Sequence, residues 1–514
     1  MWAFDRLGLS AALCCAFLSI LAANVAFLRR RRSLPLPPGP PGIPFIGNIY
    51  SVPSRTPWVQ YMTWSRELMS DVISLQAFGE TTIIINTRKA AKELLVHRSS
   101  TYADRPRVPM LELMTMDFVT GFLPYSEEWR THRKLFHRVF QARSSLGHAS
   151  LQLLEGERLI QKLSEDPTNF IGHIRHSAAA IVMAIAYGHD VTSEHDRFVD
   201  IAEETVVMMI QNVMPGAAIV NVFPFWMKFK SFARKCASLV KEMLDGPFER
   251  VKCGMVKALF GVHQVYRIIK TVKTVKGEEL IKRVAGTVFQ GMNNHEKNHN
   301  LAGTDTTATA VTNAIVAFMQ HPGVQRRAQA DIDRVVGRNR LPTLDDQDNL
   351  PFIGAACREI LRWKVIVPLG FPYKAMQDEI YEGRLIPKGT TVFGNVWALL
   401  NDPEVYPEPE CFRPERFLND DGTLNDDAVG PAFGFGRRIC SGMDFAHTTI
   451  WIMVAHILAI FTIETAQDNN GTQGPADVKY SDGLLSHPDA FKCSIRVRDE
   501  EARELLRNLR SGRI

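Results

Sequence analysis

One cysteine in a glycine-rich turn is the residue of this sequence best placed to do chemistry. Residues 433–442 read FGFGRRICSG, and an apolar helical pattern follows over 443–461. A thiolate on Cys440 would lie at the start of that helix, where the positive end of the helix dipole stabilises it. The backbone N–H groups of Ser441 and Gly442 could bind it as well. The turn is therefore suited to hold a metal-bound thiolate.

Three neighbours of this cysteine suit a flat, anionic ligand. Gly434 and Gly436 let the backbone turn tightly and approach such a ligand where a Cβ would clash. Arg438 can meet a carboxylate of the same ligand. The segment alone leaves two interpretations open, because a buried free cysteine in a turn before a helix shows the same pattern as a metal-binding one.

The spacing of the turn resembles the haem-binding loop of the cytochrome P-450 family of haem-thiolate monooxygenases. The family's F-x-x-G-x-R-x-C-x-G pattern is matched in full by Phe433, Gly436, Arg438, Cys440 and Gly442. The resemblance implies that Cys440 is the axial ligand of the iron of haem b and that the other four residues form its binding loop. In this family the thiolate pushes electron density onto the iron and favours O–O cleavage.

A second motif resembles the family's A-G-x-[DE]-T signature. LAGTDTT opens an apolar helical pattern over 301–320 and supplies Ala302, Gly303, Asp305 and Thr306. Cleavage of bound O₂ needs protons at the distal oxygen without free water in the site. The resemblance implies that Thr306 holds the proton donor and that Asp305 recruits protons from solvent. The alternative is a threonine-rich helix start with Asp305 as its cap.

The segment WRTHRK, at the start of another helical pattern, contains a pair of donors. Trp129 and Arg133 are four residues apart, so they share one face of a helix and can bind one carboxylate. The family places such a pair on a haem propionate, and the alternative is an aromatic and a charge on an ordinary surface helix. Near Tyr373 and Lys374 the family usually has a propionate-binding His or Arg, and either residue here could donate to a propionate.

Three further features are expected to shape the core and the pocket. Glu359 and Arg362 lie one helical turn apart and can pair, and Arg416 can complete a charged network that we expect to be structural. Residues 103–124 lack periodicity and predict a loop, which by resemblance roofs the substrate pocket. Residues 483–498 predict a terminal hairpin whose turn, by the same resemblance, reaches that pocket.

The N-terminus predicts a membrane anchor. Residues 7–28 are almost continuously apolar, and 22 residues in a helix span about 33 Å, enough for a hydrocarbon core of about 30 Å. Four arginines at 29–32 follow, against a lone Arg6 before the stretch, so the positive-inside rule keeps the remaining chain on the cytosolic side. The alternative is a cleaved signal peptide, although the basic cluster lies on the wrong side for one.

These segments divide the chain into a membrane anchor with its basic stop over 1–32, a proline-rich hinge over 33–44 and a catalytic domain over 45–514. Within the hinge, PLPPGPPG at 35–42 predicts a stiff extended connector. Residues 217–229 are a further apolar segment, which is either part of the core or a second, shallow contact with the lipid bilayer.

Composition excludes several other classes. The 514 residues are 46% hydrophobic and 22% charged, an ordinary globular balance, and a net charge of +5 is too small to argue for nucleic acid. The eight cysteines form no C-x-x-C pair, so neither a disulfide framework nor a zinc site is indicated.

The predicted fold class is mainly α. Segments rich in β-branched residues at 72–78 and 81–86 predict a hairpin and 88–97 predicts a short helix, while helical patterns dominate the rest of the chain after the hinge. The resemblance implies the cytochrome P-450 fold, a large helical domain with a small β region, here with one N-terminal transmembrane helix.

Two stretches depart from the family. Residues 291–301, GMNNHEKNHNL, are an apparent insert between the helical pattern of 278–290 and LAGTDTT. Because glycine and asparagine are poor helix formers, we expect a break there. Residues 257–276 also fail to resemble the family. Read-through introns in a gene model would explain both stretches, and either would put activity in doubt.

The resemblance is closest to fungal secondary-metabolism oxidoreductases of the O-methylsterigmatocystin oxidoreductase type. It implies insertion of one oxygen atom from O₂ into an apolar small-molecule substrate. NADPH supplies the electrons through a membrane-bound NADPH–cytochrome P-450 reductase and is not bound by this chain; Lys134 and Arg437 are candidates for the docking face. The implied location is the endoplasmic reticulum membrane, single-pass, with the catalytic domain on the cytosolic side. The alternatives are a reductase-independent haem-thiolate isomerase or dehydratase, and an inactive or non-enzymatic membrane-anchored haem protein.

Overall fold

The computed structural model describes most of the chain after the predicted anchor, namely residues 34–44, 46–53, 55–77, 79–140, 148–191, 196–213, 230–252, 275–289, 303–466 and 478–511. The expected anchor over 7–28, the apolar segment 217–229 and the apparent insert 291–301 lie outside these ranges. Residues 257–274 of the other departing stretch lie outside them as well.

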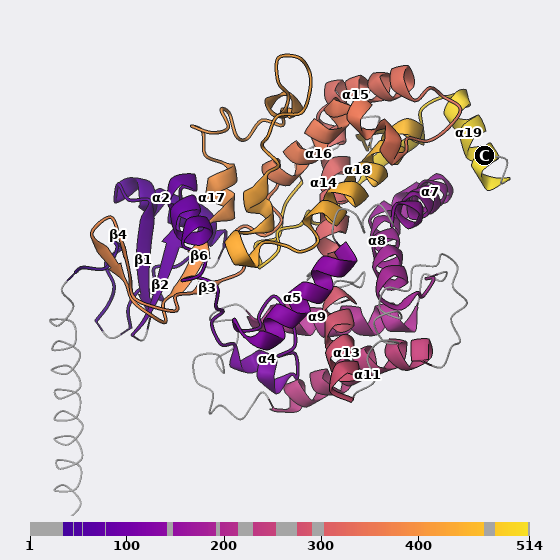
Figure 1. Cartoon of the computed structure of the whole chain (residues 1–514). Coiled ribbons are helices and arrows are strands. Elements are labelled where there is room, and N and C mark those ends of the chain that lie inside the picture. The colour runs from indigo at the N-terminus through magenta and orange to yellow at the C-terminus, as the bar shows by residue number, and fades with distance from the viewer. Residues whose placement is uncertain are drawn as a thin grey trace, which may run out of the picture.

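The fold is mainly helical with a small β region, as predicted (Figure 1). The α-helices are α2 (Pro57–Glu67), α3 (Arg88–Ala91), α4 (Pro109–Leu113), α5 (Glu127–Phe140), α7 (Ala149–Glu165), α8 (Phe170–Tyr187), α9 (Arg197–Val213), α11 (Lys230–Lys252), α13 (Val275–Phe289), α14 (Gly303–Gln320), α15 (Pro322–Val335), α16 (Pro351–Trp363), α17 (Val396–Leu400), α18 (Met443–Ile460) and α19 (Glu500–Arg510). The strands are β1 (Val72–Ala77), β2 (Glu80–Ile85), β3 (Tyr373–Lys374), β4 (Glu379–Tyr381), β5 (Arg384–Ile386), β6 (Thr391–Gly394), β7 (Phe461–Thr465) and β8 (Cys493–Val497).

The predicted hairpin forms the edge of a four-stranded sheet. Strands β1 and β2 pair antiparallel from Val72 with Ile85 to Ala77 with Glu80. Strand β6 pairs parallel with β2 and antiparallel with β3, which gives the order β1-β2-β6-β3. Figure 1 shows this sheet at one side of the helical region, next to α2 and α17. The predicted helix after the hairpin begins as α3 and continues as a π-helical turn over Lys92–His97.

The predicted terminal hairpin over 483–498 is wrong. Strand β8 pairs antiparallel with β7, which directly follows α18, and the register joins Phe461 to Val497. In the described part of the segment before β8, Tyr480 and Pro488 form only an isolated bridge. The residues over 483–498 predict a local turn. They cannot show that β8 pairs with β7, because β7 lies about 30 residues earlier in the chain.

The proline-rich hinge is extended and fastened to the sheet region. Residues 35–42 contain no helix, as predicted. The N–H of Leu385 in β5 donates to the carbonyl of Pro35 at 2.8 Å. The N–H of Ser74 in β1 donates to the carbonyl of Pro38, also at 2.8 Å. A segment whose prolines cannot donate is therefore held through its carbonyl groups.

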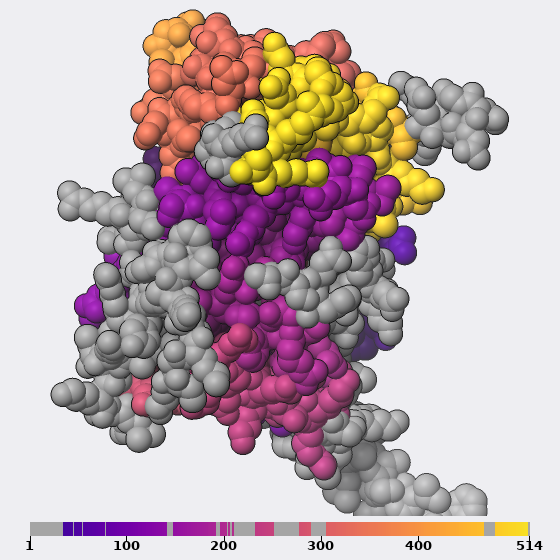
Figure 2. All heavy atoms as spheres, turned by 90° about the vertical axis from the view of Figure 1, so that its right-hand side faces the viewer, coloured from indigo at the N-terminus to yellow at the C-terminus, as the bar shows by residue number. Residues whose placement is uncertain are grey.

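Helices α14 and α18 occupy the centre of the helical region. Helix α18 is buried along most of its length, and α14 packs against α8, α16 and α18. Within the described residues, Pro167–Tyr187 and α18 are long and apolar enough to cross a membrane, but 72% of each lies inside the fold, so they are core helices. Because Cys440 precedes α18 and Thr306 lies on α14, the core helices carry predicted site residues. Helix α19 packs against α7 and α18, and it lies at the outer surface next to α7 (Figure 2).

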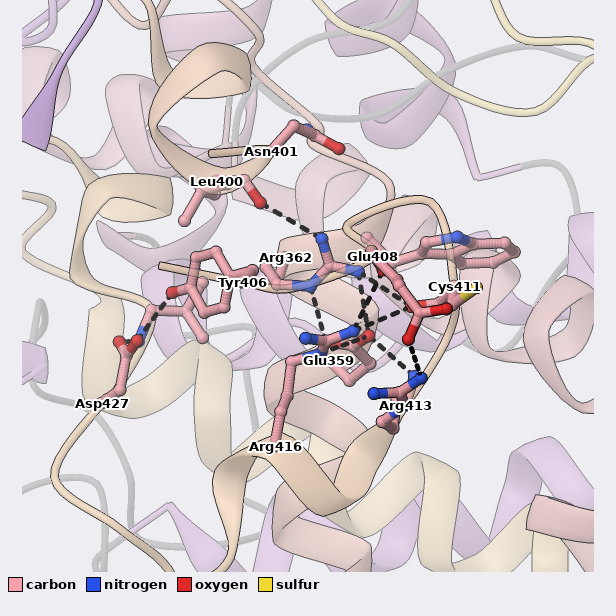
Figure 3. Close-up of polar contacts among 12 residues, drawn as sticks. Glu359, Arg362, Leu400, Asn401, Tyr406, Glu408, Cys411, Arg413, Arg416 and Asp427 are labelled. Atoms are coloured by element: carbon pink, nitrogen blue, oxygen red, sulfur yellow. Dashed lines mark hydrogen bonds and ion pairs between the residues drawn. The ribbon is translucent and has the colours of Figure 1, made fainter. Parts of the chain in front are cut away.

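The predicted charged network of Glu359, Arg362 and Arg416 is present and buried (Figure 3). Arg362 donates Nε and Nη2 to the Glu359 carboxylate at 2.6 and 2.9 Å, and both side chains are fully buried. Arg416 Nε donates to the same carboxylate at 3.2 Å, and the N–H of Arg413 donates to it at 2.8 Å. One buried carboxylate therefore pairs with two guanidiniums and accepts hydrogen bonds from both of them and from a backbone N–H.

The network also fixes the irregular segment between β6 and α18. Arg362 Nη1 donates to the carbonyl of Leu400 at 3.1 Å. The ring of Tyr406 is near two guanidiniums, with Cζ of Arg88 at 4.7 Å and Cζ of Arg362 at 5.5 Å from its centroid. The hydroxyl of Tyr406 donates to Asp427 at 2.6 Å (Figure 3). Cation–π contacts and hydrogen bonds thus replace regular secondary structure here.

Replacing Glu359 by Ala should lower the free energy of unfolding by about 3–5 kcal/mol, because two guanidiniums lose their buried counter-charge. The matched control is Glu242→Ala, which removes an exposed partner of Arg197 at 2.8 Å and should cost about 0–1 kcal/mol. Urea unfolding followed by tryptophan fluorescence measures both. A loss for Glu359→Ala no larger than that for Glu242→Ala would contradict the structural role of the network.

Candidate active site

The loop before α18 is closed by its own backbone. The N–H of Cys440 donates to the carbonyl of Phe433 at 2.8 Å, which joins the two ends of the turn. Gly434 and Gly436 have φ of 85° and 53°, in the left-handed region that favours glycine. A Cβ on Gly436 would also lie 2.3 Å from the carbonyl oxygen of Leu95. The turn that presents the cysteine therefore requires both glycines.

Burial raises the pKa of the Cys440 thiol. The N–H of Gly442 and the charge of Arg133 oppose this rise in the pKa, and the carboxylate of Asp444 adds to it. The predicted helix-start N–H is thus present at the sulfur. A metal bound to the sulfur would displace the proton outright.

Helix α5 places Arg133 beside the cysteine. Its Nη1 donates to the hydroxyl of Ser441 at 2.7 Å and to the carbonyl of Ile439, the residues on either side of Cys440. Burial lowers the pKa of Arg133, and the sulfur of Cys440 opposes that shift. Arg133 therefore supports the cysteine loop directly, and its predicted contact with a propionate stays a prediction.

Arg438 lies against Trp129, which is on α5 one turn before Arg133. Arg438 is 8% exposed, and its Cζ lies 4.2 Å from the centroid of the Trp129 ring. Its Nε donates to the carbonyl of Ala103 at 2.6 Å, and its Nη2 donates to that of Leu123 at 2.9 Å. Its Nη1 is buried without an acceptor among the described residues. The Nη1 group of Arg438, beside Trp129, therefore has N–H donors that no acceptor among the described residues satisfies.

A second buried cation, Arg105, was missed in the sequence. It is 6% exposed and donates to the carbonyls of Gly121 at 2.9 Å and Pro372 at 2.6 Å. Its Cζ lies 4.7 Å from the ring centroid of Tyr373. The sequence offered little signal, because Arg105 is one of five charged residues in the loop of 103–124.

Tyr373 joins this cation to the cysteine loop. Its hydroxyl accepts the N–H of Phe435 at 3.0 Å, within the turn that presents Cys440. Burial raises the pKa of Tyr373, and the nearby charge of Arg105 opposes the rise. Burial, followed by repulsion from Arg105, lowers the pKa of Arg438 to about 9. Among the described residues, no carboxylate forms an ion pair with either arginine.

These residues fit a haem group. A flat ring with an axial sulfur suits the glycine turn, and two propionates suit a site where buried cations lack carboxylate partners. The unpaired Nη1 of Arg438 is the specific observation behind this fit, because a buried donor without an acceptor costs free energy. Within the described residues, no group of three His, Cys, Asp or Glu side chains could hold a metal ion by itself.

The predicted oxygen-site residues lie in the first turn of α14. Helix α14 begins at Gly303, so Asp305 is inside its first turn and is not the cap residue of the alternative interpretation. Asp305 is 1% exposed. Helix α14 packs against α18, which follows the cysteine loop. The helix that carries Thr306 thus packs against the helix that follows Cys440. The proton-transfer roles of Asp305 and Thr306 stay predictions.

The predicted docking cations lie near the site but on its outside. Lys134 and Arg437 are both exposed. Arg437 donates to the hydroxyl of Tyr125 at 2.7 Å, and the ring of Tyr125 lies 5.2 Å from that of Trp129. The guanidinium of Arg437 is therefore held in one orientation at the rim of the cysteine loop.

Comparison with known proteins agrees with this geometry. The sequence profile of the cytochrome P-450 family matches residues 37–493. A cytochrome P-450 monooxygenase of Armillaria gallica is 35% identical over 506 residues, covering 94% of this chain and 96% of the relative. Tryptamine 4-monooxygenase of Psilocybe cyanescens is 35% identical over 503 residues, with the same two coverages.

A third relative, a cytochrome P-450 monooxygenase of Coprinopsis cinerea, is 34% identical over 492 residues and covers 92% of this chain and 94% of its own length. The matched residues include the cysteine loop, the first turn of α14 and the charged network of α16. Site geometry and full-length similarity agree, and the chain belongs to the cytochrome P-450 family of haem-thiolate oxygenases.

Proposed function

We propose that this enzyme inserts one oxygen atom from O₂ into an apolar small molecule of secondary metabolism, with electrons from NADPH through a membrane-bound reductase. The observation that supports it best is the joining of Cys440, in its glycine turn, to the buried pair Arg105 and Arg438. The haem supplies O₂ binding and activation when it is bound. Membership of the cytochrome P-450 family supports an oxygenase activity. The substrate, its metabolic pathway and the reductase partner are proposals.

The residues of the cysteine loop would hold the haem from one face. Cys440 would bind the iron, and Phe433, Gly436 and Gly442 would shape the turn around the sulfur. Arg438, with its free Nη1, would donate to a propionate beside Trp129. Arg133 would steady the loop through Ser441 and reach the same edge of the ring.

On the other face, α14 would control protons. The hydroxyl of Thr306 would hold a proton donor at the substrate side, and Asp305 would bring protons into the first turn of the helix. A buried carboxylate in a site that excludes bulk water can move protons one at a time. The presence of this pair argues against a reductase-independent isomerase or dehydratase, which needs no proton delivery to O₂.

The reductase would dock on the face that carries Lys134 and Arg437, because acidic partners are steered by exposed cations. The anchor over 1–32 would hold the enzyme in the endoplasmic reticulum membrane as a single-pass protein facing the cytosol. The hinge, whose bonds to β1 and β5 begin at Pro35, would join this anchor to the sheet. Residues 217–229 would add a shallow second contact.

An inactive or non-enzymatic haem protein is the second candidate, and the departures at 257–276 and 291–301 favour it. The expected break between α13 and α14 lies outside the described residues. Transcript sequence across codons 257–302 decides whether these stretches belong to the protein. A transcript that lacks them would assign the insert to the gene model and favour the active enzyme.

Replacing Cys440 by Ala should abolish the red-shifted Soret band that a haem-thiolate gives with carbon monoxide after reduction, because no thiolate then reaches the iron. The control is Cys357→Ala, which removes a buried cysteine of α16. Absorption difference spectra of the full chain measure both. An unaltered band in Cys440→Ala would refute the ligand assignment.

Replacing Thr306 by Ala should leave that band intact but lower product formation by roughly a hundredfold while NADPH use continues and peroxide appears. The proton donor is then no longer held, so the O–O bond survives. The matched control is Thr312→Ala, whose hydroxyl donates to the carbonyl of Ala308 at 2.8 Å within the same helix. Equal peroxide-to-product ratios in the two variants would show that LAGTDTT is not the oxygen site.

Deleting residues 1–32 should move most of the protein from the microsomal pellet to the supernatant, because the apolar span is then lost. Phe225→Ser in the deleted chain should release the fraction that remains bound. Replacing 1–32 by an unrelated spanning helix should restore sedimentation. A truncated chain that stays fully bound, with no effect of Phe225→Ser, would place the anchor elsewhere.

A further inference from the structure

Helix α14 carries a buried amide two turns beyond the proposed oxygen-site residue. Asn313 lies seven residues after Thr306. The two residues therefore share one face of the helix to within about 20° and are separated by roughly 10 Å along its axis. Asn313 is 0% exposed. A buried amide needs partners for its donor and for its acceptor, and those partners show which segments it holds.

Both ends of the Asn313 amide hold irregular segments. Its Nδ2 donates to the carbonyl of Lys364, the residue that follows α16, at 3.3 Å. Its Oδ1 accepts the hydroxyl of Tyr480, from the segment between β7 and β8, at 3.1 Å. One side chain of a core helix therefore fastens two segments that have little regular structure of their own.

The first of these segments, residues 364–373, we call the strap. It begins at the bond to Asn313 and ends at the cysteine loop, because the hydroxyl of Tyr373 accepts the N–H of Phe435 at 3.0 Å. A backbone bond from α17 holds its middle. The strap thus joins α14 to the turn that presents the cysteine. A ligand that contacts both of these parts would lie beside the strap.

The second segment, residues 479–489, is a loop closed by its own bonds. Tyr480 and Pro488 form an isolated bridge across its base. Inside the loop, the hydroxyl of Ser481 donates to the carbonyl of Leu485 at 3.1 Å. Because these bonds fix its internal shape, the position of this closed loop in the molecule depends on its attachments to other elements.

The closed loop, the strap and α14 bond to one another in pairs. The N–H of Ser486 in the closed loop donates to the carbonyl of Ile366 in the strap at 2.8 Å. The other two bonds of this triangle are the ones that Asn313 makes to Lys364 and to Tyr480. Removal of the Asn313 amide would therefore leave the strap and the closed loop bonded to each other while both lose a bond to α14.

We propose that Asn313 is a positioning residue, which holds the strap and the closed loop in register with Thr306 and thereby sets the orientation of an apolar ligand in the site. The inference rests on the proposed monooxygenase function. Asn313 acts through the two segments that it fastens, so it has no need to contact the ligand itself. Because its bonds are buried, each should contribute measurably to the position of these segments.

The test uses the full-length, haem-loaded protein with Asn313→Leu, a side chain of similar size without hydrogen-bonding groups. The matched control is Gln325→Leu. Gln325 is a buried amide of α15 that accepts the N–H of Ile463 in β7 at 2.8 Å and donates to its carbonyl at 3.0 Å. The probes are the two enantiomers of econazole, whose azole nitrogen binds iron while their apolar groups meet the walls of the site. Their dissociation constants follow from the change in the haem absorption spectrum.

The ratio of the two dissociation constants should change by about fivefold in Asn313→Leu and stay within about twofold of the wild-type ratio in the control. Tyr480→Phe removes the bond of the closed loop alone and should change the ratio by about threefold. The double variant should match Asn313→Leu, because both changes remove the bond between Asn313 and Tyr480. A ratio within about twofold of wild type in both single variants, or an equal change in the control, would overturn the inference.

Hydrogen exchange without ligand checks the attachment itself. The amide of Ser486, which donates to Ile366, should exchange about tenfold faster in Asn313→Leu than in wild type or in Gln325→Leu. Unchanged exchange would also overturn the inference.

Tyr480→Phe carries both measurements if Asn313→Leu does not bind haem. Wild-type protein that shows no spectral change with either enantiomer would reject the haem-thiolate function. Hydrogen exchange in the same samples would still decide whether Asn313 holds the closed loop, so the two failures are distinguishable.

Discussion

Two buried guanidiniums without carboxylate partners are the constraint on which the site depends. Arg105 and Arg438 lie close enough for their repulsion to help lower the pKa of Arg438 to about 9. Backbone carbonyls accept most of their N–H groups, and those carbonyls belong to the loop of 103–124 and to the residues just before β3. Burial of unpaired cations is costly unless an anion completes the site. A propionate bound at Arg438, as proposed, would therefore stabilise the fold of this region.

At α16, in contrast, two buried guanidiniums share a carboxylate partner. There Glu359 forms ion pairs with Arg362 and Arg416, and the spare N–H groups bind carbonyls of a segment with little regular structure. The two clusters use the same chemistry but differ in their ion pairs. The cluster at Glu359 contains its own carboxylate, whereas Arg105 and Arg438 form no ion pair among the described residues.

The sequence predicted the parts whose signals are local. The cysteine turn, the helix after it, the β1–β2 hairpin and the pair Glu359 with Arg362 depend on spacing within a few residues. The pairing of β7 with β8 was mispredicted, because a strand partner beyond an intervening segment leaves no local pattern. Arg105 was missed because a single arginine in a loop is ordinarily a solvated charge, and only the fold shows that it is buried next to Tyr373.

The bonds of the proline-rich hinge set the length of the tether between the proposed anchor and the catalytic domain. Pro35 is already bonded to β5. If the apolar span ends at residue 28 as proposed, only residues 29–34 would separate the membrane from this bond. Extended residues span at most about 3.6 Å each, so this connection would reach roughly 25 Å. An anchored domain would then lie close to the lipid surface, and a reductase in the same bilayer would meet it in a narrow range of orientations.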